Sequence, residues 1–143
     1  MSGTPDVVLV EDNPDDADLI VHAFRKTHVA NHVEVITDGE SAIRRLGERA
    51  LAGDGQIPAL VLLDLKLPRR SGFEVLEWMR GNDQARLWPV VVLTSSNQNG
   101  DIRRAYELGA NSYLVKPVAS EALLDLIRTL NRYWIVLNRP AEP

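Results

Sequence analysis

Four short apolar runs in this chain each end in a polar residue that can take part in chemistry. The runs are Val7–Val10, Leu60–Leu63, Val90–Leu93 and Tyr113–Val115. Nearly continuous apolar strands are typical of parallel sheets whose two faces are both covered by helices. Together with a run at residues 33–36, the pattern predicts five strands. Their expected bounds are about 6–11, 33–36, 60–64, 89–94 and 112–116.

Helical patterns lie between these strands. The first opens at Asn13-Pro14, where Asn13 is a good N-cap and Pro14 suits the first helical position. The fourth spans Asn97 to Leu108 and is followed by Gly109, a plausible C-terminal cap. The second, third and fifth helices are expected to start at Asp38-Gly39, Ser71-Gly72 and Ser120-Glu121. Strands that alternate with helices predict βαβ units, and therefore an α/β fold with a parallel sheet.

The polar residues at the strand ends are candidates for a single site. Ligands of parallel α/β sheets bind outside the carboxyl ends of the strands. The pattern therefore places Glu11, Asp12, Asp64, Thr94 and Lys116 together. Three neighbouring carboxylates repel one another, so the cluster indicates a hard cation bound by oxygen atoms.

The composition limits the other possibilities. A length of 143 residues fits one domain, and the absence of cysteine excludes disulfides, thiolate zinc sites and cysteine nucleophiles. The net charge is −4 and no Lys/Arg block exceeds two residues, so direct nucleic-acid binding is not expected. No apolar stretch approaches a membrane span, and the N-terminus lacks the features of a signal peptide. We therefore expect no membrane association and a cytoplasmic location.

The chemistry of the predicted site centres on Asp64. A carboxylate at a strand end can ligate a metal or act as a nucleophile, and aspartate nucleophiles form acyl phosphates. Phosphoryl transfer to Asp64 would need Mg²⁺, which Glu11 and Asp12 can hold directly or through water. Lys116 can supply a cation for one phosphoryl oxygen, and Thr94 a hydroxyl for another. Each residue alone has an ordinary explanation as a cap or a solvated charge, but their joint placement favours a functional site.

Several ordered motifs resemble the receiver domain of two-component response regulators over about residues 6–133. The motifs are Val10-Glu11-Asp12-Asn13, Leu63-Asp64-Leu65-Lys66-Leu67-Pro68 with Gly72, Leu93-Thr94-Ser95 and Tyr113-Leu114-Val115-Lys116-Pro117. The resemblance implies a flavodoxin-like fold, with a doubly wound, five-stranded parallel sheet of order 2-1-3-4-5. It also implies a signalling protein rather than an enzyme, with autophosphorylation from small phosphodonors and autodephosphorylation.

The same resemblance implies roles for individual residues. Asp64 would be the phosphoacceptor. Asp12 and Asp64 would ligate Mg²⁺ together with the Lys66 backbone carbonyl, and Glu11 would act through water. Thr94 and Tyr113 would form a switch pair. Lys116 would bind the phosphoryl group, and the Lys116–Pro117 peptide bond is a candidate for the cis form. Glu11 stands where an aspartate is commoner, a change that many receivers carry.

A finer likeness is to stand-alone regulators associated with bacterial phytochromes. It rests on the Asp-Asp-Ala-Asp segment after Pro14, on residues 106–111 and on Tyr133-Trp134. A sensor histidine kinase is the implied partner, with a bacteriophytochrome as the candidate. The expected receiver domain covers residues 1–134, and residues 135–143 form a C-terminal extension without an output domain.

The residues disfavour three other functions. An aspartyl phosphohydrolase would need an acid at the position of Lys66. In a flavodoxin-like electron carrier, Glu11 and Asp12 would repel the FMN phosphate. A degenerate receiver that serves only as an interaction module would be expected to lack part of the site, but all the expected residues are present.

The fifth helix carries more apolar surface than one sheet face requires. Its stripe is Leu123, Leu126, Ile127, Leu130, Trp134 and Leu137. We expect a two-fold homodimer through this helix and the C-terminal extension, with Leu130, Trp134 and Leu137 at the interface. The alternative is that the end of the helix folds back onto its own domain.

Overall fold

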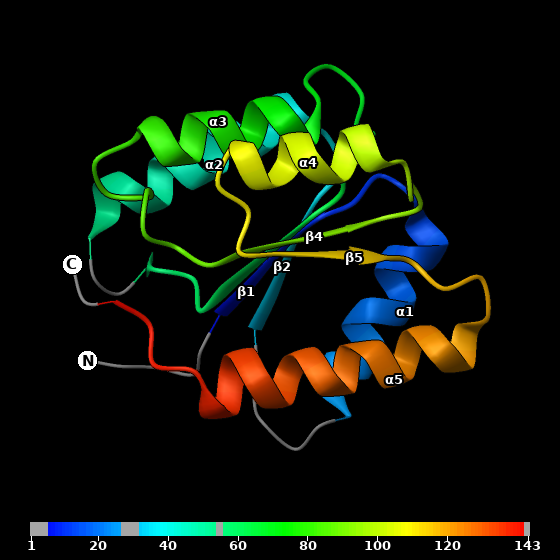
Figure 1. Cartoon of the computed structure of the whole chain (residues 1–143). Coiled ribbons are helices and arrows are strands. Elements are labelled where there is room, and N and C mark those ends of the chain that lie inside the picture. The colour runs from blue at the N-terminus through cyan, green and yellow to red at the C-terminus, as the bar shows by residue number, and fades with distance from the viewer. Residues whose placement is uncertain (1–5, 27–31, 54–55, 142–143) are drawn as a thin grey trace.

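Five parallel strands form the centre of the computed structural model, which describes residues 6–26, 32–53 and 56–141 (Figure 1). The strands are β1 (Asp6–Val10), β2 (His32–Ile36), β3 (Leu60–Leu63), β4 (Val90–Thr94) and β5 (Ser112–Val115). They pair in the order β2-β1-β3-β4-β5, and every neighbouring pair is parallel. The predicted sheet and strand order are confirmed, and each strand end lies within one residue of its expected place.

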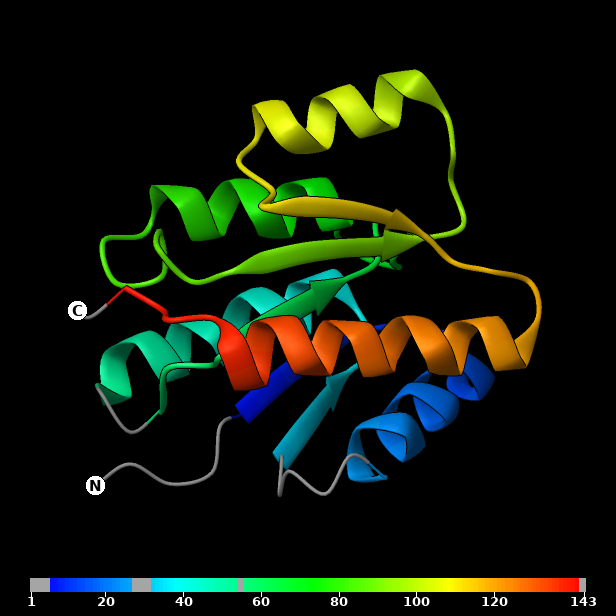
Figure 2. The same ribbon diagram turned by 60° about the horizontal axis from the view of Figure 1, so that its bottom comes forward.

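Helices cover both faces of the sheet. They are α1 (Pro14–Arg25), α2 (Gly39–Ala52), α3 (Gly72–Gly81), α4 (Asn99–Glu107) and α5 (Ser120–Leu130), with a π-helical segment η2 (Asn131–Leu137) after α5. The helices α2, α3 and α4 lie on one face, and α1 and α5 lie on the other (Figures 1 and 2). The fold is therefore doubly wound, as expected. Within the described residues, no helix combines the length and the apolar character that crossing a membrane requires.

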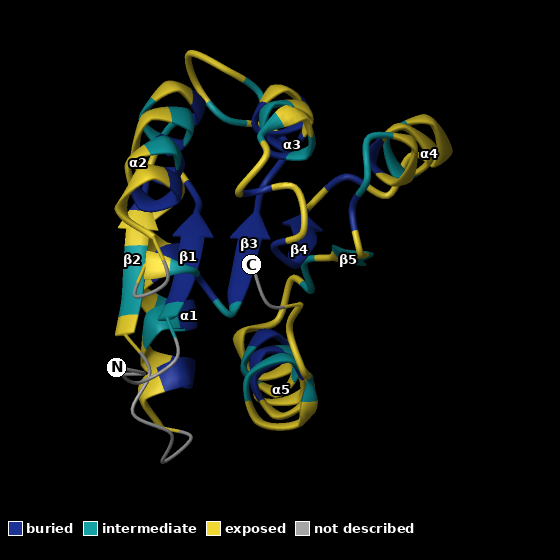
Figure 3. Ribbon diagram, turned by 90° about the vertical axis from the view of Figure 1, so that its left-hand side faces the viewer, coloured by how far each residue is buried: buried dark blue, intermediate teal, exposed yellow. Residues whose placement is uncertain are grey.

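The sheet separates two hydrophobic layers. Successive strand residues point to opposite faces, so Val8 and Val10 pack under α2 and α3 while Val7 and Leu9 pack against α1 and α5. Figure 3 shows that β1, β3 and β4 are buried, whereas the edge strands β2 and β5 are partly exposed. The central strands are therefore held rigidly, and the side chains at their carboxyl ends are placed by this packed core.

Side-chain caps fix where three helices start. The Asn13 and Asp38 side chains accept hydrogen bonds from backbone amides in the first turns of α1 and α2. Ser71 and Glu74 form a reciprocal capping box at α3. These three starts were predicted correctly. The fourth helix begins at Asn99, two residues later than expected, because Ser96 organises a loop by bonding the residues that follow it.

Gly72 lies where the loop after β3 passes close to the start of α3. Its N–H donates to the Leu65 carbonyl at 2.8 Å, and a Cβ at this position would lie 2.1 Å from the Asp64 carbonyl oxygen. We expect Gly72→Ala to lower the free energy of unfolding by about 1–3 kcal/mol through overpacking, as measured by urea denaturation. Gly81→Ala at the other end of α3 is the control, because a Cβ there meets nothing within 4 Å. Equal stability of the two variants would contradict the close contact.

The π-helical segment changes the register of the predicted apolar stripe. A π-helix places more residues in each turn than an α-helix, and the Asn138 N–H donates to the Tyr133 carbonyl at 2.7 Å, five residues back. Asn131, one turn after Ile127, is still buried, whereas Leu137 at the end of the π-helical segment is 56% exposed. The expectation of one continuous stripe to Leu137 is therefore wrong. Trp134 packs against the hydrophobic layer between the sheet and the helices α1 and α5. The end of the helix therefore folds back in part onto its own domain.

Candidate functional site

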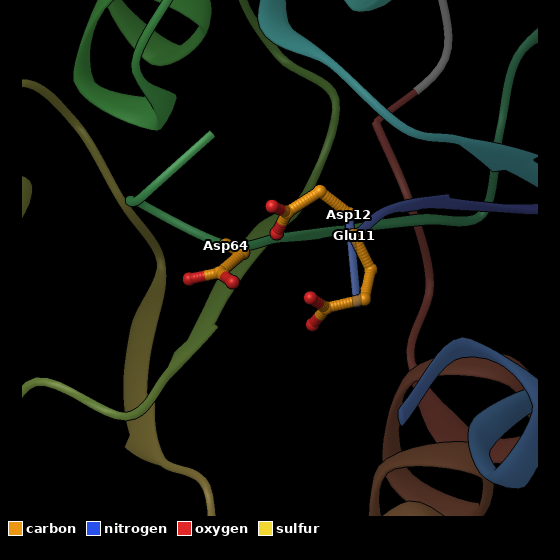
Figure 4. A group of neighbouring side chains, drawn as sticks. All are labelled: Glu11, Asp12 and Asp64. Carbon is orange, nitrogen blue, oxygen red and sulfur yellow. The ribbon is translucent and has the colours of Figure 1, made fainter. Parts of the chain in front are cut away.

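The carboxyl ends of the central strands bring three acidic side chains together. Glu11 and Asp12 follow β1, and Asp64 follows β3. Figure 4 shows their carboxylates gathered at this end of the sheet. One oxygen from each of the three lies within 4.8 Å of the others. Glu11 and Asp64 are buried and Asp12 is exposed, so two of the three carboxylates are shielded from solvent and the third is accessible.

Lys116 supplies the positive charge in this cluster. Its Nζ lies 2.7 Å from Glu11 Oε1, 2.9 Å from Asp16 Oδ2 and 3.5 Å from Asp64 Oδ2. Its backbone N–H donates to the Thr94 carbonyl at 2.7 Å, which anchors the end of β5 to the end of β4. The sequence predicted a repulsion that a metal would have to relieve. In the structure, the Lys116 ammonium already compensates part of it.

Burial and the neighbouring charges have opposite effects on the pKa values of Glu11 and Lys116. Removal of Glu11 from water raises the pKa of its carboxyl to about 7, although the hydrogen bonds from Lys116 and the Asn13 amide oppose the shift. Burial also disfavours the Lys116 ammonium, but the Glu11, Asp16 and Asp64 carboxylates outweigh it and raise the pKa of Lys116. Lys116 therefore stays protonated at neutral pH, whereas Glu11 exchanges its proton in this range.

Thr94 and Tyr113 lie on the strands beside the cluster. Thr94 is fully buried, and its Oγ1 has no hydrogen-bond partner within the part of the chain that the structure describes. A buried hydroxyl without a partner costs free energy, so its place suits an acceptor oxygen of a ligand. The Tyr113 hydroxyl donates to the Ser96 carbonyl at 2.9 Å, and burial raises the pKa of Tyr113. Tyr113 thereby ties β5 to the loop after β4.

Lys66 lies beside Asp64 through its backbone, while its side chain is exposed. The Lys66 N–H donates a long hydrogen bond of 3.4 Å to Asp64 Oδ1. The predicted role of the Lys66 carbonyl as a metal ligand stays a prediction. Among the described residues no peptide bond is cis, so the candidate cis bond between Lys116 and Pro117 is wrong.

Two contacts at the site were missed from the sequence. Asp16 forms an ion pair with Lys116, and the Ser96 hydroxyl bonds Asp101 at 2.5 Å. A usable signal for Asp16 was its position in the first turn of α1, because that turn starts at the same sheet edge as the strand-end acids. The Ser96 contact had no comparable signal, since it depends on the path of an irregular loop.

The donor set suits a hard divalent cation. Carboxylate oxygens are the ligands that Mg²⁺ prefers, and the exposed Asp12 leaves the cluster accessible from solvent. The same acids disfavour the electron-carrier alternative, because they would repel an FMN phosphate. The phosphohydrolase alternative is also disfavoured, since position 66 is an exposed lysine rather than an acid near Asp64.

Comparison with known proteins agrees with this geometry. Residues 7–128 match the family described as the response regulator receiver domain. The chain belongs to this family. The match covers the five strands except the first residue of β1, most of the fifth helix and every residue of the strand-end cluster.

Relatives of similar length are known. The probable methanogenesis regulatory protein FilR2 of Methanothrix harundinacea is 41% identical over 138 residues, which cover 96% of this chain and 88% of FilR2. Response regulator Rcp1 of Synechocystis sp. is 32% identical over 129 residues, covering 90% of this chain and 88% of Rcp1.

Solved structures give the same fold. The Mn²⁺-bound form of response regulator Rcp1 has a TM-score of 0.88 and 29% identity, covering 96% of this chain and 99% of that one. The phosphorylated cyanobacterial phytochrome response regulator RcpA also has a TM-score of 0.88, with 32% identity and coverage of 98% and 100%.

Proposed function

We propose that this protein is a response regulator whose receiver domain accepts a phosphoryl group from a histidine kinase onto Asp64 in a Mg²⁺-dependent reaction. One observation carries the proposal. The buried Asp64 carboxylate lies among two further carboxylates and one ammonium, and the buried Thr94 hydroxyl at the end of the next strand has no partner among the described residues. The phosphorylated state of the relative RcpA supports it.

The transfer step follows from the chemistry of Asp64. A carboxylate oxygen of Asp64 attacks the phosphorus of the donor phosphohistidine. An O–P bond forms as the P–N bond breaks, and the electron pair of the broken bond stays on the imidazole nitrogen. Asp12 and Asp64, with the Lys66 carbonyl and with Glu11 through water, would hold Mg²⁺. When bound, this ion neutralises charge that would otherwise keep the phosphoryl group and the carboxylates apart.

The switch would use Thr94, Lys116 and Tyr113. Thr94 and Lys116 can contact phosphoryl oxygens only when Asp64 carries the group, and this differential contact shifts the population toward a phosphorylated conformation. Tyr113, whose hydroxyl donates to the Ser96 carbonyl, would couple this conformational change to the loop after β4.

The protein would also phosphorylate itself from small donors and lose the group by autodephosphorylation. Incorporation of phosphate from acetyl phosphate in wild type, and its loss in Asp64→Asn, tests the assignment.

The finer proposal for the partner is a phytochrome-type histidine kinase in the cytoplasm. It is supported by the likeness to RcpA, which is described as a phytochrome response regulator. Transfer rates from a set of phosphorylated histidine kinases, measured in parallel, would identify the preferred donor. Equal or slower transfer from the phytochrome-type kinases would argue against this partner.

Mg²⁺ binding is expected to strengthen as pH rises through neutrality. The pKa of Glu11 is raised to about 7 in the metal-free protein, so the carboxyl is mainly protonated at pH 6 and mainly ionised at pH 8. The metal must compete with that proton. We expect Mg²⁺ to bind roughly tenfold more weakly at pH 6 than at pH 8, since one unit below a pKa leaves about one group in ten ionised.

NMR titration of backbone amide shifts with Mg²⁺ at the two pH values measures this difference. Glu11→Gln provides the matched control, because the amide keeps the shape of the side chain but has no proton to release. A wild-type affinity that does not change with pH, or a Glu11→Gln variant with the same pH dependence, would contradict the role of Glu11.

We further propose a homodimer formed by the C-terminal end of the receiver domain (to residue 134) and by the extension at residues 135–143. Leu130 is buried within its own domain, and Trp134 packs partly there. The exposed apolar residues that remain are Tyr133, Val136 and Leu137, which are 54%, 50% and 56% exposed. Pairing this surface across a two-fold axis would remove it from water.

A charge in this surface should abolish the dimer. We expect wild type to sediment as a dimer at micromolar concentration, and the double variant Val136→Glu/Leu137→Glu to sediment as a monomer, because buried unpaired carboxylates are costly. Leu51→Glu is the matched control, since Leu51 is 90% exposed on α2, on the other face of the sheet. A monomeric wild type in both phosphorylation states would rule the dimer out.

A further inference from the structure

Asp16 joins the candidate site from α1. Its Oδ2 lies 2.9 Å from Lys116 Nζ, although the two residues are 100 positions apart. The Lys116 side chain is only 9% exposed and that of Asp16 is 32% exposed. Asp16 is held in place by its own N–H, which donates to the Asn13 side chain at 3.0 Å. The contact is therefore partly shielded from water and its acidic partner is fixed by a helix cap.

The Lys116 ammonium lies closer to Glu11 and Asp16 than to Asp64. The distances are 2.7 Å to Glu11, 2.9 Å to Asp16 and 3.5 Å to Asp64. Glu11 and Asp64 belong to the cluster that suits a metal ion, so Asp16 is the one ion-pair partner of Lys116 outside that cluster among the described residues. An ammonium held only by Glu11 and Asp64 would compete with a metal for their oxygens.

We infer that Asp16 is a positioning residue, which holds the Lys116 ammonium on the α1 side of the site while Asp64 is unphosphorylated. Lys116 then exchanges Asp16 for a phosphoryl oxygen when Asp64 carries the group. This inference rests on the proposed function, since it assumes that Asp64 is the phosphoacceptor. Asp16 binds Lys116 in one state and loses it in the other, so it favours the unphosphorylated state by that difference.

The inference predicts two effects of opposite sign in Asp16→Asn. Mg²⁺ should bind about fivefold more weakly, because Lys116 then stays among the metal-binding oxygens. Beryllofluoride, a stable phosphoryl analogue, should bind about fivefold more tightly in saturating Mg²⁺, because Lys116 no longer has to break an ion pair with Asp16 before it contacts the analogue. These factors correspond to one partly exposed ion pair. Both dissociation constants can be measured from backbone amide shifts in NMR titrations.

Loss of a negative charge near the site would change both affinities in the same directions without any role for Lys116. Asp15→Asn controls for this, because Asp15 is the exposed neighbour on α1 and forms no ion pair among the described residues. We expect it to change either affinity less than twofold. A double-mutant cycle is the stricter control, since in a Lys116→Met background Asp16→Asn should also change Mg²⁺ affinity less than twofold.

The outcomes separate this inference from the proposed function. Failure of wild type to bind beryllofluoride would contradict the proposed function itself. Normal binding by wild type with equal effects of Asp15→Asn and Asp16→Asn, or with an Asp16→Asn effect that persists in Lys116→Met, would overturn the inference alone.

A urea-unfolding cycle on the metal-free protein measures the coupling between Asp16 and Lys116 directly. Coupling in stability without any change in the two affinities would reduce Asp16 to a structural contact, and absence of coupling would exclude its role.

Discussion

Asp64→Asn is expected to abolish phosphorylation by acetyl phosphate in the presence of Mg²⁺. The amide nitrogen and oxygen of asparagine are poor nucleophiles, and asparagine has nearly the same size and shape as aspartate. Wild type should gain one phosphoryl group that is stable in acid and labile in base, as an acyl phosphate is, and the variant should gain none. Intact-protein mass spectrometry after a timed incubation gives the measurement.

The substitution also removes a metal-binding carboxylate, so a second variant is needed to separate the two roles. Asp12→Asn removes the exposed carboxylate of the same cluster. It should slow labelling at low Mg²⁺ and recover at high Mg²⁺, whereas Asp64→Asn should stay unlabelled at any concentration. Asp83→Asn, an exposed aspartate in the loop after α3, should behave as wild type. A phosphoryl group retained by Asp64→Asn would assign the nucleophile to another residue, and an unlabelled wild type would favour a degenerate receiver.

Lys116→Met is expected to destabilise the metal-free protein strongly and to make it dependent on Mg²⁺. The ammonium is the cation that Glu11 and Asp64 share, and both carboxylates are almost fully buried. Removing one partner of a buried ion pair typically costs 3–5 kcal/mol. We expect roughly 3 kcal/mol at pH 8, at the lower end of that range, because Glu11 can relieve part of the repulsion by binding a proton.

Two conditions should reduce this loss. Saturating Mg²⁺ should restore stability, since it replaces the missing positive charge and binds only the folded state. Lowering the pH from 8 to 6 should also help, because the pKa of Glu11 is raised and protonation removes one of the repelling charges. Urea denaturation at both pH values, with and without Mg²⁺, measures the free energy of unfolding under all four conditions.

Lys66→Met is the matched control, because its ammonium is exposed and lies in the loop next to Asp64. We expect it to change stability by less than about 0.5 kcal/mol, as is usual for surface positions. Equal losses in the two variants, or a Lys116→Met loss that Mg²⁺ does not reduce, would mean that Lys116 does not neutralise the cluster.

Most of the fold could be predicted because its signals are local. The apolar runs have the length and continuity of strands covered on both faces, and Asn13, Asp38 and Ser71 cap their helices within one turn of the chain. Parallel strands present their carboxyl ends at one edge, so the grouping of Glu11, Asp12 and Asp64 followed from topology alone. The start of α4 could not be placed, because Ser96 and Asp101 organise the preceding loop through a side-chain contact.

The end of the chain shows a second limit. The apolar pattern predicts one α-helical stripe from α5 through Trp134 to Leu137, but the π-helical segment after Leu130 rotates the later residues. The sequence alone does not distinguish an α-helical from a π-helical turn here, since both keep the backbone hydrogen-bonded. Trp134 in this segment packs against the hydrophobic layer between the sheet and the helices α1 and α5.

The amino-acid sequence by itself determined the α/β class, the strand positions, the edge of the sheet that carries the site and the three acidic residues at the strand ends. Tertiary structure alone decided which charges meet. Whether Lys116 reaches Glu11, Asp16 or Asp64 depends on the twist of the sheet, the cap that fixes α1 and the reach of a long side chain. Both helical layers must be packed before burial can raise the pKa of Glu11 and leave the Thr94 hydroxyl without a partner among the residues that the structure describes. Periodicity along the chain carries local geometry, but ion pairing and desolvation depend on distances between segments that the folded core brings together.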